Sequence, residues 1–262
     1  MASLLSVENL QVQFQTKKGI NTAVDGVSFS VEKGRILGIV GESGCGKSVT
    51  SMSILQLLGS NARISGGSIK LDGKELIGLP EKEMCRIRGN DIAMIFQDPM
   101  TALNPTLTIG TQLMEPIMLH QNCGKKEAWT RAVDVLKRVG IAAPEKRMKE
   151  YPHQLSGGMR QRVMIAMAVS CEPRLLIADE PTTALDVTIQ AQILELMCEL
   201  REKMGTAIML ITHDMGVVAE TADDVLVLYA GKAVEYGSIE DIFERPKHPY
   251  TCLLYTSPSP RD

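Results

Sequence analysis

Apolar residues recur with two different spacings along this chain, and the spacings divide it into regions. Apolar and polar residues alternate, with many β-branched side chains, over residues 4–14 and 22–34. Alternation with period two is typical of strands. A small hairpin is expected over residues 65–76, because Asp72-Gly73 is a favoured two-residue turn. The N-terminal region is therefore predicted to form an antiparallel β subdomain.

Helical spacing dominates the middle of the chain. Residues 81–153 show this spacing and little strand signal, so we interpret residues 99–155 as a helical insert. Short apolar strands and helices alternate on both sides of the insert: strands at 35–40, 174–179 and 207–212, a helix at 188–205 ended by Gly205, and a hairpin at 223–237. This alternation favours a mostly parallel core sheet covered by helices. The fold class is therefore α/β, and residues 1–262 are expected to form a single domain.

Composition excludes several classes of protein. The chain has 262 residues, of which 44% are hydrophobic and 23% charged, as in ordinary globular proteins. The net charge of −3 gives no electrostatic reason to expect a nucleic-acid partner. No segment approaches the roughly 18 apolar residues of a membrane helix, and no signal peptide is expected. The six cysteines lack metal-ligand spacing, which indicates reduced thiols in a cytosolic protein.

The clearest chemical motif is a glycine-rich loop, Gly41–Ser48, which fits G-x-x-x-x-G-K-[ST] in full. It follows an apolar strand and precedes a helix predicted over residues 47–58, as a phosphate-binding loop requires. Glycines let backbone N–H groups surround phosphate oxygens, and a helix N-terminus favours anions. Lys47 would reach the β- and γ-phosphates, and the Ser48 hydroxyl would bind Mg²⁺. The plain alternative is a strand–turn–helix corner. The expected nucleotide contacts are Gly41, Glu42, Ser43, Gly44, Cys45, Gly46, Lys47, Ser48 and Val49.

Cys45 occupies a spacer position within this loop. It could serve spacing alone. A helix N-terminus lowers the pKa of a nearby thiol, however, so we expect the Cys45 thiol to be reactive. Alkylation of Cys45 would then inhibit the protein, and bound nucleotide would protect it.

Two adjacent carboxylates, Asp179 and Glu180, follow the apolar strand at residues 174–179. Ligands of parallel sheets bind at the carboxyl ends of the strands. Asp179 would hold Mg²⁺, through water, and Glu180 would polarise an attacking water molecule. The alternative is an acidic start to the next helix. Together with the loop, these residues indicate a P-loop NTPase, a class that includes kinases, GTPases and ATPases.

A family resemblance separates these classes. Residues 155–161 resemble the signature sequence of ABC-type ATPases, and the resemblance extends over residues 4–251. It implies an ABC ATPase fold with ATP and Mg²⁺ as cofactors. Ser156, Gly157 and Gly158 open a predicted helix, which could be an ordinary capped start or an anion site. In the family, the signature meets the γ-phosphate held by the opposite subunit, and the resemblance carries this role to Ser156, Gly157, Gly158 and Gln161.

The resemblance implies further roles outside the loop and the signature. Gln97 would contact Mg²⁺ or water and act as the hinge of the helical insert. His213 would contact the γ-phosphate, and Asp186 would cross to the other subunit. Phe14 would stack on adenine, although an aromatic at this position could equally belong to the core. The expected catalytic residues are thus Glu180, His213, Lys47 and Gln97, and the expected metal-binding residues are Ser48, Gln97 and Asp179.

One stretch, Phe96–Pro105, indicates a branch of the family. It resembles importers of dipeptides, oligopeptides and nickel, specifically the first of the two ATPase subunits in dipeptide-type systems. The implied partners are a second homologous ATPase in a heterodimer, two membrane-spanning permease subunits and, indirectly, an extracytoplasmic substrate-binding protein. The implied location is the cytoplasmic face of the plasma (inner) membrane of a bacterium or archaeon, with ATP driving alternating access.

Two alternatives stay open at the level of sequence. The chain could serve another ABC transporter branch, such as a lipid exporter or an amino-acid importer, or it could be a soluble ABC ATPase. The cargo is also open between peptides and nickel. Members of the implied branch usually extend further, so residues 251–262 are expected to be disordered or foreign to the family. Cys252 alone cannot supply the ligands of an iron–sulfur cluster.

Overall fold

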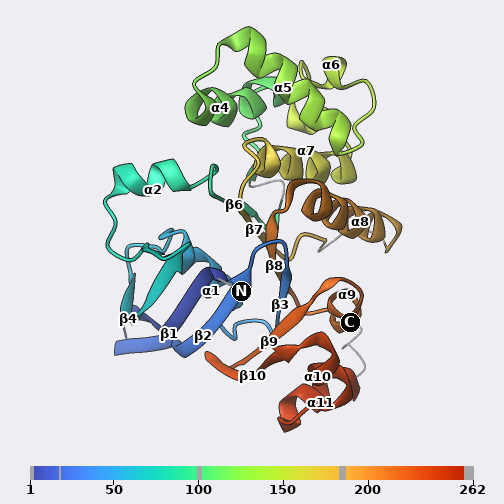
Figure 1. Cartoon of the computed structure of the whole chain (residues 1–262). Coiled ribbons are helices and arrows are strands. Elements are labelled where there is room, and N and C mark those ends of the chain that lie inside the picture. The colour runs from blue at the N-terminus through green and yellow to red at the C-terminus, as the bar shows by residue number, and fades with distance from the viewer. Residues whose placement is uncertain (1–2, 18, 99–101, 183–186, 257–262) are drawn as a thin grey trace. The chain divides into compact units, whose positions relative to one another are not determined.

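The computed structural model describes residues 3–17, 19–98, 102–182 and 187–256. These residues divide into two compact units. Unit 1 combines the described residues of Met1–Met84 with those of Ala207–Asp262, and unit 2 is Cys85–Thr206. Figure 1 labels the helices and strands of both units.

The antiparallel sheet of unit 1 confirms the predicted N-terminal hairpins. Its strand order is β2-β1-β4-β5, and every neighbouring pair is antiparallel. Asp72 and Gly73, between the last two strands, both have positive φ angles, 49° and 82°, as a tight hairpin turn requires. The strands are β1 (Ser3–Thr16), β2 (Gly19–Glu32), β4 (Ala62–Leu71) and β5 (Lys74–Glu75).

A second group of strands in unit 1 holds the parallel pairs. Strand β3 (Ile36–Val40) pairs in parallel with β8 (Ala207–Thr212) and with β9 (Asp224–Tyr229), while β10 (Lys232–Ser238) pairs antiparallel with β9. Every residue of β3 and β8 is buried, as in strands covered on both faces. The helices of this unit are α1 (Lys47–Ile54), α9 (Met215–Thr221), α10 (Ile239–Glu244) and α11 (Pro249–Thr256). Helix α2 (Glu81–Ile87) crosses the boundary between the units.

Unit 2 is mainly helical. Its strands β6 (Ile92–Ile95) and β7 (Leu175–Asp179) pair in parallel. Buried Ala and aliphatic residues of α5 pack against α4 and α7, which gives this unit its own apolar core. The helices are α4 (Ile109–Gln121), α5 (Lys125–Arg138), α6 (Pro144–Arg147), the 3₁₀ turn η1 (Pro152–Gln154), α7 (Gly157–Val169) and α8 (Val187–Met204).

Two segments differ from their predicted structure. The helix predicted over residues 47–58 ends at Ile54, because Gln56 adopts a left-handed conformation (φ 51°) that a helix cannot contain. Residues 251–262 are expected from sequence to be disordered or foreign to the family, but residues 251–256 of that segment are helical and belong to α11. Pro249 opens this helix at the first helical position, which proline favours. Residues 257–262 lie outside the described residues. Among the helices that the structure describes, none is long and apolar enough to cross a bilayer.

Candidate functional site

The glycine-rich loop lies in unit 1 between β3 and α1 (Figure 1). Its three glycines all have positive φ angles: 151° at Gly41, 81° at Gly44 and 106° at Gly46. A Cβ atom at Gly41 would lie 2.2 Å from the Leu228 carbonyl oxygen. Side chains are therefore excluded at Gly41 by space as well as by backbone conformation. The sequence pattern and the loop geometry agree on why glycine is needed here.

The charge of Lys47 is buried within this loop. The side chain is 5% exposed, and its Nζ donates hydrogen bonds to the carbonyl oxygens of Gly41 (2.7 Å) and Glu42 (2.9 Å). A buried ammonium group needs such partners because desolvation is costly. These two bonds use two of the three N–H donors of the ammonium. Lys47 is thus a fixed cation at the first turn of α1.

The N-terminus of α1 adds backbone donors to this cation. Its N-cap is Gly46, and no side chain among the described residues caps the helix. The first turn contains no acidic residue. The leading N–H groups of such a helix favour an anion, and Ser48 in the same turn is exposed. Glycines, buried lysine and uncapped helix start together fit a phosphate group.

Cys45 corrects a prediction made from sequence. Burial raises the pKa of its thiol, and the opposing effect of the Lys47 charge is smaller. The expectation of a lowered thiol pKa is therefore wrong, because the side chain is buried, with 6% exposed, rather than placed in water at the helix end. Its sulfur would lie 2.7 Å from a Cβ placed on Gly41, so the thiol packs against the loop backbone.

His213 leaves the core strands beside the phosphate loop. Val40 pairs with Thr212 in the parallel ladder of β3 and β8, so the residues that follow, Gly41 and His213, leave neighbouring strand ends. His213 is exposed. Phe14, on β1, is partly exposed and opposite Asn21 in the antiparallel ladder, so it is not among the buried core residues.

Gln97 and Glu180 meet in unit 2. Ile95 pairs with Ala178 in the parallel ladder of β6 and β7, and both polar residues follow two positions later. Gln97 Nε2 donates a hydrogen bond to Glu180 Oε2 at 2.9 Å. The amide of Gln97 therefore orients the carboxyl group of Glu180 through a neutral donor. The sequence analysis placed Glu180 at a strand end, and the structure places Gln97 after the neighbouring strand and brings the two residues into contact.

Glu180 also adopts an unusual backbone conformation. Its φ angle is 47°, in the left-handed region that costs a non-glycine residue of the order of 1–3 kcal/mol. The preceding Asp179 is the last residue of β7 and is 5% exposed. The turn thus separates a buried carboxylate from a more exposed one directly after it. Strain of this kind is common at functional sites.

The signature residues form the start of α7 in unit 2. Ser156 is the N-cap, and its side chain accepts a hydrogen bond from the Met159 N–H at 3.4 Å. Gly157 is exposed, as an anion site requires. Gln161, expected to contact nucleotide, is instead 2% exposed and donates to the Pro181 carbonyl oxygen. In this structure its side-chain amide holds the residue that follows Glu180.

Sequence reasoning missed the residues that hold the phosphate loop from outside. Gly231 N–H donates to the Cys45 carbonyl oxygen (3.1 Å), and the Glu42 N–H donates to Tyr250 Oη (2.9 Å). Tyr250 lies within residues 245–251, a stretch that the sequence analysis left without a chemical role. The prediction for Asp186 falls outside the described residues.

The donors available for a metal ion are of the type that Mg²⁺ prefers. Ser48, Gln97 and Asp179 offer hydroxyl, amide and carboxylate oxygens. Within the described residues no three His, Cys, Asp or Glu side chains cluster as a metal site. Magnesium at nucleotide sites commonly uses one or two carboxylates and takes its other ligands from phosphates and water. Ser48 of unit 1, and Gln97 and Asp179 of unit 2, are thus each of a residue type that could bind Mg²⁺.

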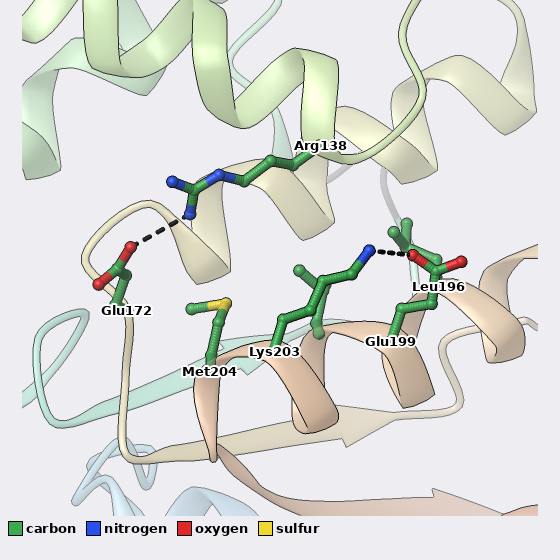
Figure 2. Close-up of a pocket in the computed structure, with 7 residues that line it drawn as sticks. Arg138, Glu172, Leu196, Glu199, Lys203 and Met204 are labelled. Atoms are coloured by element: carbon green, nitrogen blue, oxygen red, sulfur yellow. Dashed lines mark hydrogen bonds and ion pairs between the residues drawn. The ribbon is translucent and has the colours of Figure 1, made fainter.

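A separate cavity of about 460 Å³ lies in unit 2 (Figure 2). Leu196, Leu200 and Met204 of α8 contribute its apolar lining. Two ion pairs border it, Arg138–Glu172 at 3.1 Å and Lys203–Glu199 at 2.6 Å. None of the site residues predicted from sequence lines this cavity.

The sequence of this chain is similar to those of known transport proteins. A protein-family model described as ABC transporter matches residues 24–183. The chain is 58% identical over 258 residues to the oligopeptide transport ATP-binding protein AppD of Bacillus subtilis (strain 168), covering 98% of this chain and 79% of that protein. It is 55% identical over 252 residues to the oligopeptide transport ATP-binding protein OppD of Escherichia coli (strain K12), covering 96% and 74%.

Solved structures resemble the fold as well. The dimeric post-hydrolysis state of the ATP-binding cassette MJ0796 bound to ADP and Pi matches with a TM-score of 0.80 and 27% identity, over 90% of this chain and 98% of that chain. The structure of cbiO1 from Clostridium perfringens, part of the ABC transporter complex cbiONQ, matches with a TM-score of 0.78 and 27% identity, over 94% and 92%.

Proposed function

The chain belongs to the ABC transporter family and is an ATPase of that family, and we propose that it powers an importer of oligopeptides or dipeptides. The observation that carries the proposal is the phosphate loop, where Lys47 is buried beside the uncapped start of α1. The cargo follows from relatives at 55–58% identity that are named for oligopeptide transport. These names favour peptides over nickel.

ATP binding is assigned to the loop residues Gly41–Ser48 and to Val49. Their backbone N–H groups and the α1 N-terminus surround the phosphates, and Lys47 compensates phosphate charge. Phe14, partly exposed on β1, stacks on the adenine ring. A fixed cation and fixed backbone dipoles bind an anion without reorganising when it arrives.

Mg²⁺ is assigned to Ser48, Gln97 and Asp179, and when bound it supplies positive charge that neutralises the phosphate oxygens. Asp179 is the last residue of β7 and supplies a buried carboxylate, a ligand type that Mg²⁺ prefers. Gln97 has a second role, because its amide donates to Glu180 and so fixes the direction of that carboxylate.

Hydrolysis is assigned to Glu180 and His213. Glu180 accepts a proton from the attacking water, and its carboxylate is oriented for this by Gln97. His213 contacts the γ-phosphate as the bond to the β-phosphate breaks. Ser156, Gly157 and Gly158 at the α7 N-terminus bind the γ-phosphate on the opposite subunit, and Asp186 contacts that subunit. Gln161 supports this group by holding Pro181 next to Glu180.

The transporter that this motor serves contains other chains. We assign it a second, homologous ATPase and two membrane-spanning permease subunits, with a substrate-binding protein acting on the outer side. The subunit is therefore peripheral, on the cytoplasmic face of a bacterial plasma membrane. Residues 1–262 act as one ATPase, with the helices of residues 99–155 moving when the nucleotide is bound and hydrolysed.

Transport by the assembled complex tests this proposal. The chain is co-expressed with two permease subunits, a second ATPase and a substrate-binding protein of the peptide-importer type. The complex is reconstituted in liposomes, with ATP supplied on the side of the ATPase subunits. Uptake of labelled dipeptides and oligopeptides that requires ATP and is lost in Lys47→Ala supports the proposal. Uptake of Ni²⁺ without peptide uptake would contradict the cargo assignment. ATP turnover without any membrane partner would instead favour a soluble ABC ATPase.

A further inference from the structure

The C-terminal helix α11 is connected to the phosphate loop through one hydrogen bond. The backbone N–H of Glu42 donates to Tyr250 Oη at 2.9 Å. Tyr250 is the second residue of α11 and is 7% exposed. The bond joins residues 208 positions apart in the sequence. Unit 1 therefore contains a contact between its nucleotide loop and its last helix that no local motif encodes.

Glu42 passes this contact on to the lysine of the loop. Its carbonyl oxygen accepts a hydrogen bond from Lys47 Nζ at 2.9 Å, while its N–H is directed to Tyr250. One residue thus lies between the phenol oxygen and the buried ammonium group. A shift of the Glu42 backbone would therefore move the carbonyl oxygen to which Lys47 Nζ donates.

Tyr250 is itself held in place from two directions. Its ring contacts the ring of Tyr229, with centroids 4.5 Å apart. The carboxylate of Glu235 accepts hydrogen bonds from the Lys247 N–H (2.7 Å) and from the Thr251 hydroxyl (2.6 Å), on either side of Tyr250 in the chain. Burial raises the pKa of the Tyr250 phenol, so it remains neutral near neutral pH. The phenol is therefore a fixed, uncharged acceptor.

We propose that Tyr250 is a positioning residue for the phosphate loop. It holds the Glu42 backbone so that Lys47 and the loop amides are ordered before ATP binds. This inference rests on the proposed ATP binding at Gly41–Ser48. A binding site ordered in advance avoids the entropy cost of ordering it on binding, so the effect of Tyr250 falls on nucleotide affinity. The turnover rate of bound ATP is not expected to change, because Tyr250 is not assigned to the reacting groups.

The variant Tyr250→Phe tests the inference. It keeps the ring against Tyr229 and removes the acceptor. We expect the Kd for MgATP, measured by calorimetry on the full chain, to rise about fivefold, the scale of one net hydrogen bond. In the assembled complex KM for ATP rises while kcat stays near its native value. The matched control is Tyr236→Phe, which removes a phenol bonded to the Ser30 carbonyl oxygen at 3.2 Å in the same unit. Tyr236 Oη also lies 3.5 Å from the Ser30 hydroxyl, so the control removes at least as much hydrogen bonding as Tyr250→Phe does.

A second measurement needs no nucleotide. Cys45 lies buried in the loop, so its alkylation rate reports how often the loop opens. Peptide mass spectrometry separates Cys45 from exposed Cys85, which serves as the internal reference. We expect Tyr250→Phe, and not Tyr236→Phe, to raise the Cys45 rate about fivefold, by the same loss of one net hydrogen bond.

The two measurements separate two kinds of failure. If the native chain binds no ATP, the proposed function fails, while the Cys45 rate still decides whether Tyr250 orders the loop. The inference itself is overturned if Tyr250→Phe leaves both ATP affinity and the Cys45 rate unchanged. It is overturned equally if Tyr236→Phe produces the same changes, because the effect would then be general loosening of unit 1.

Discussion

Replacing Gly41 with alanine tests how closely the phosphate loop is enclosed by its surroundings. The new Cβ would lie 2.2 Å from the Leu228 carbonyl oxygen and 2.7 Å from Cys45 Sγ. The Leu228 oxygen belongs to a strand, β9, in which Leu228 pairs with Ala233 of β10, so it cannot move without disturbing that ladder. Gly41 also has a φ of 151°, which an alanine adopts only with strain.

The matched comparison is Gly44→Ala in the same loop. Gly44 has a φ of 81°, but a Cβ added there would have no neighbouring atom within 4 Å. Gly44→Ala therefore lowers the free energy of unfolding only through the left-handed backbone, by about 1–2 kcal/mol. Gly41→Ala adds a steric clash that costs about 1–3 kcal/mol more, and its total loss of unfolding free energy is about 4 kcal/mol. For a chain of this size, those energies lower Tm by about 4 °C for Gly44→Ala and about 12 °C for Gly41→Ala.

Differential scanning calorimetry without nucleotide measures this difference, since ATP would add its own binding energy. Gly41→Ala should melt well below Gly44→Ala. If the two variants melted together, the close approach of Gly41 to the Leu228 carbonyl oxygen would not restrict the loop, and the reasoning would be refuted.

Three further predictions concern other groups of the molecule. Iodoacetamide at about pH 8 should modify exposed Cys85 several times faster than Cys45, because burial raises the pKa of the Cys45 thiol, and equal rates would contradict this. Burial acts to raise the pKa of Glu235, but hydrogen bonds from Thr251, Lys247 and His248 outweigh it and hold this pKa below its ordinary value of 4.5. The ionised Glu235 carboxylate stabilises the fold above pH 4.5, and this stabilisation is lost as the pH falls through the folded-state pKa. Between about pH 6 and about pH 3.5 the Tm of the native chain should therefore fall further than that of Glu235→Gln. Equal falls in Tm for the two proteins would refute this linkage. Gln97→Ala should slow ATP hydrolysis about tenfold, because the Glu180 carboxylate loses a donor at 2.9 Å, and an unchanged rate would remove Gln97 from the reaction.

Much of the site was predictable because its signals are local. The motif Gly41–Ser48 requires glycine where the structure has positive φ angles, and the apolar run before it became the buried strand β3. The strand at 174–179 placed Glu180 correctly at a strand end. In each case the residues that define the element are neighbours in the sequence, so their pattern records the geometry.

The remaining features depend on contacts between distant residues. The bond from Glu42 to Tyr250 spans 208 positions, and nothing near either residue indicates it. Cys45 has a raised pKa because folding buries it, whereas the sequence shows only a thiol beside a helix start. The left-handed conformation of Glu180 was equally hidden, because a glutamate in sequence gives no sign of it. Tertiary packing therefore set these properties, and local propensity could not predict them.

The turnover of ATP by Glu180→Gln tests the central claim most directly. The control is Glu172→Gln, which alters an exposed glutamate of the same unit that pairs with Arg138. With each variant assembled in the native complex, we predict that Glu180→Gln binds ATP as the native protein does and hydrolyses it more slowly by about 100-fold or more, the scale of a lost general base. Glu172→Gln should hydrolyse ATP at the native rate. Near-native turnover by Glu180→Gln, or an equal loss in both variants, would contradict the assignment of this site as the one that hydrolyses ATP.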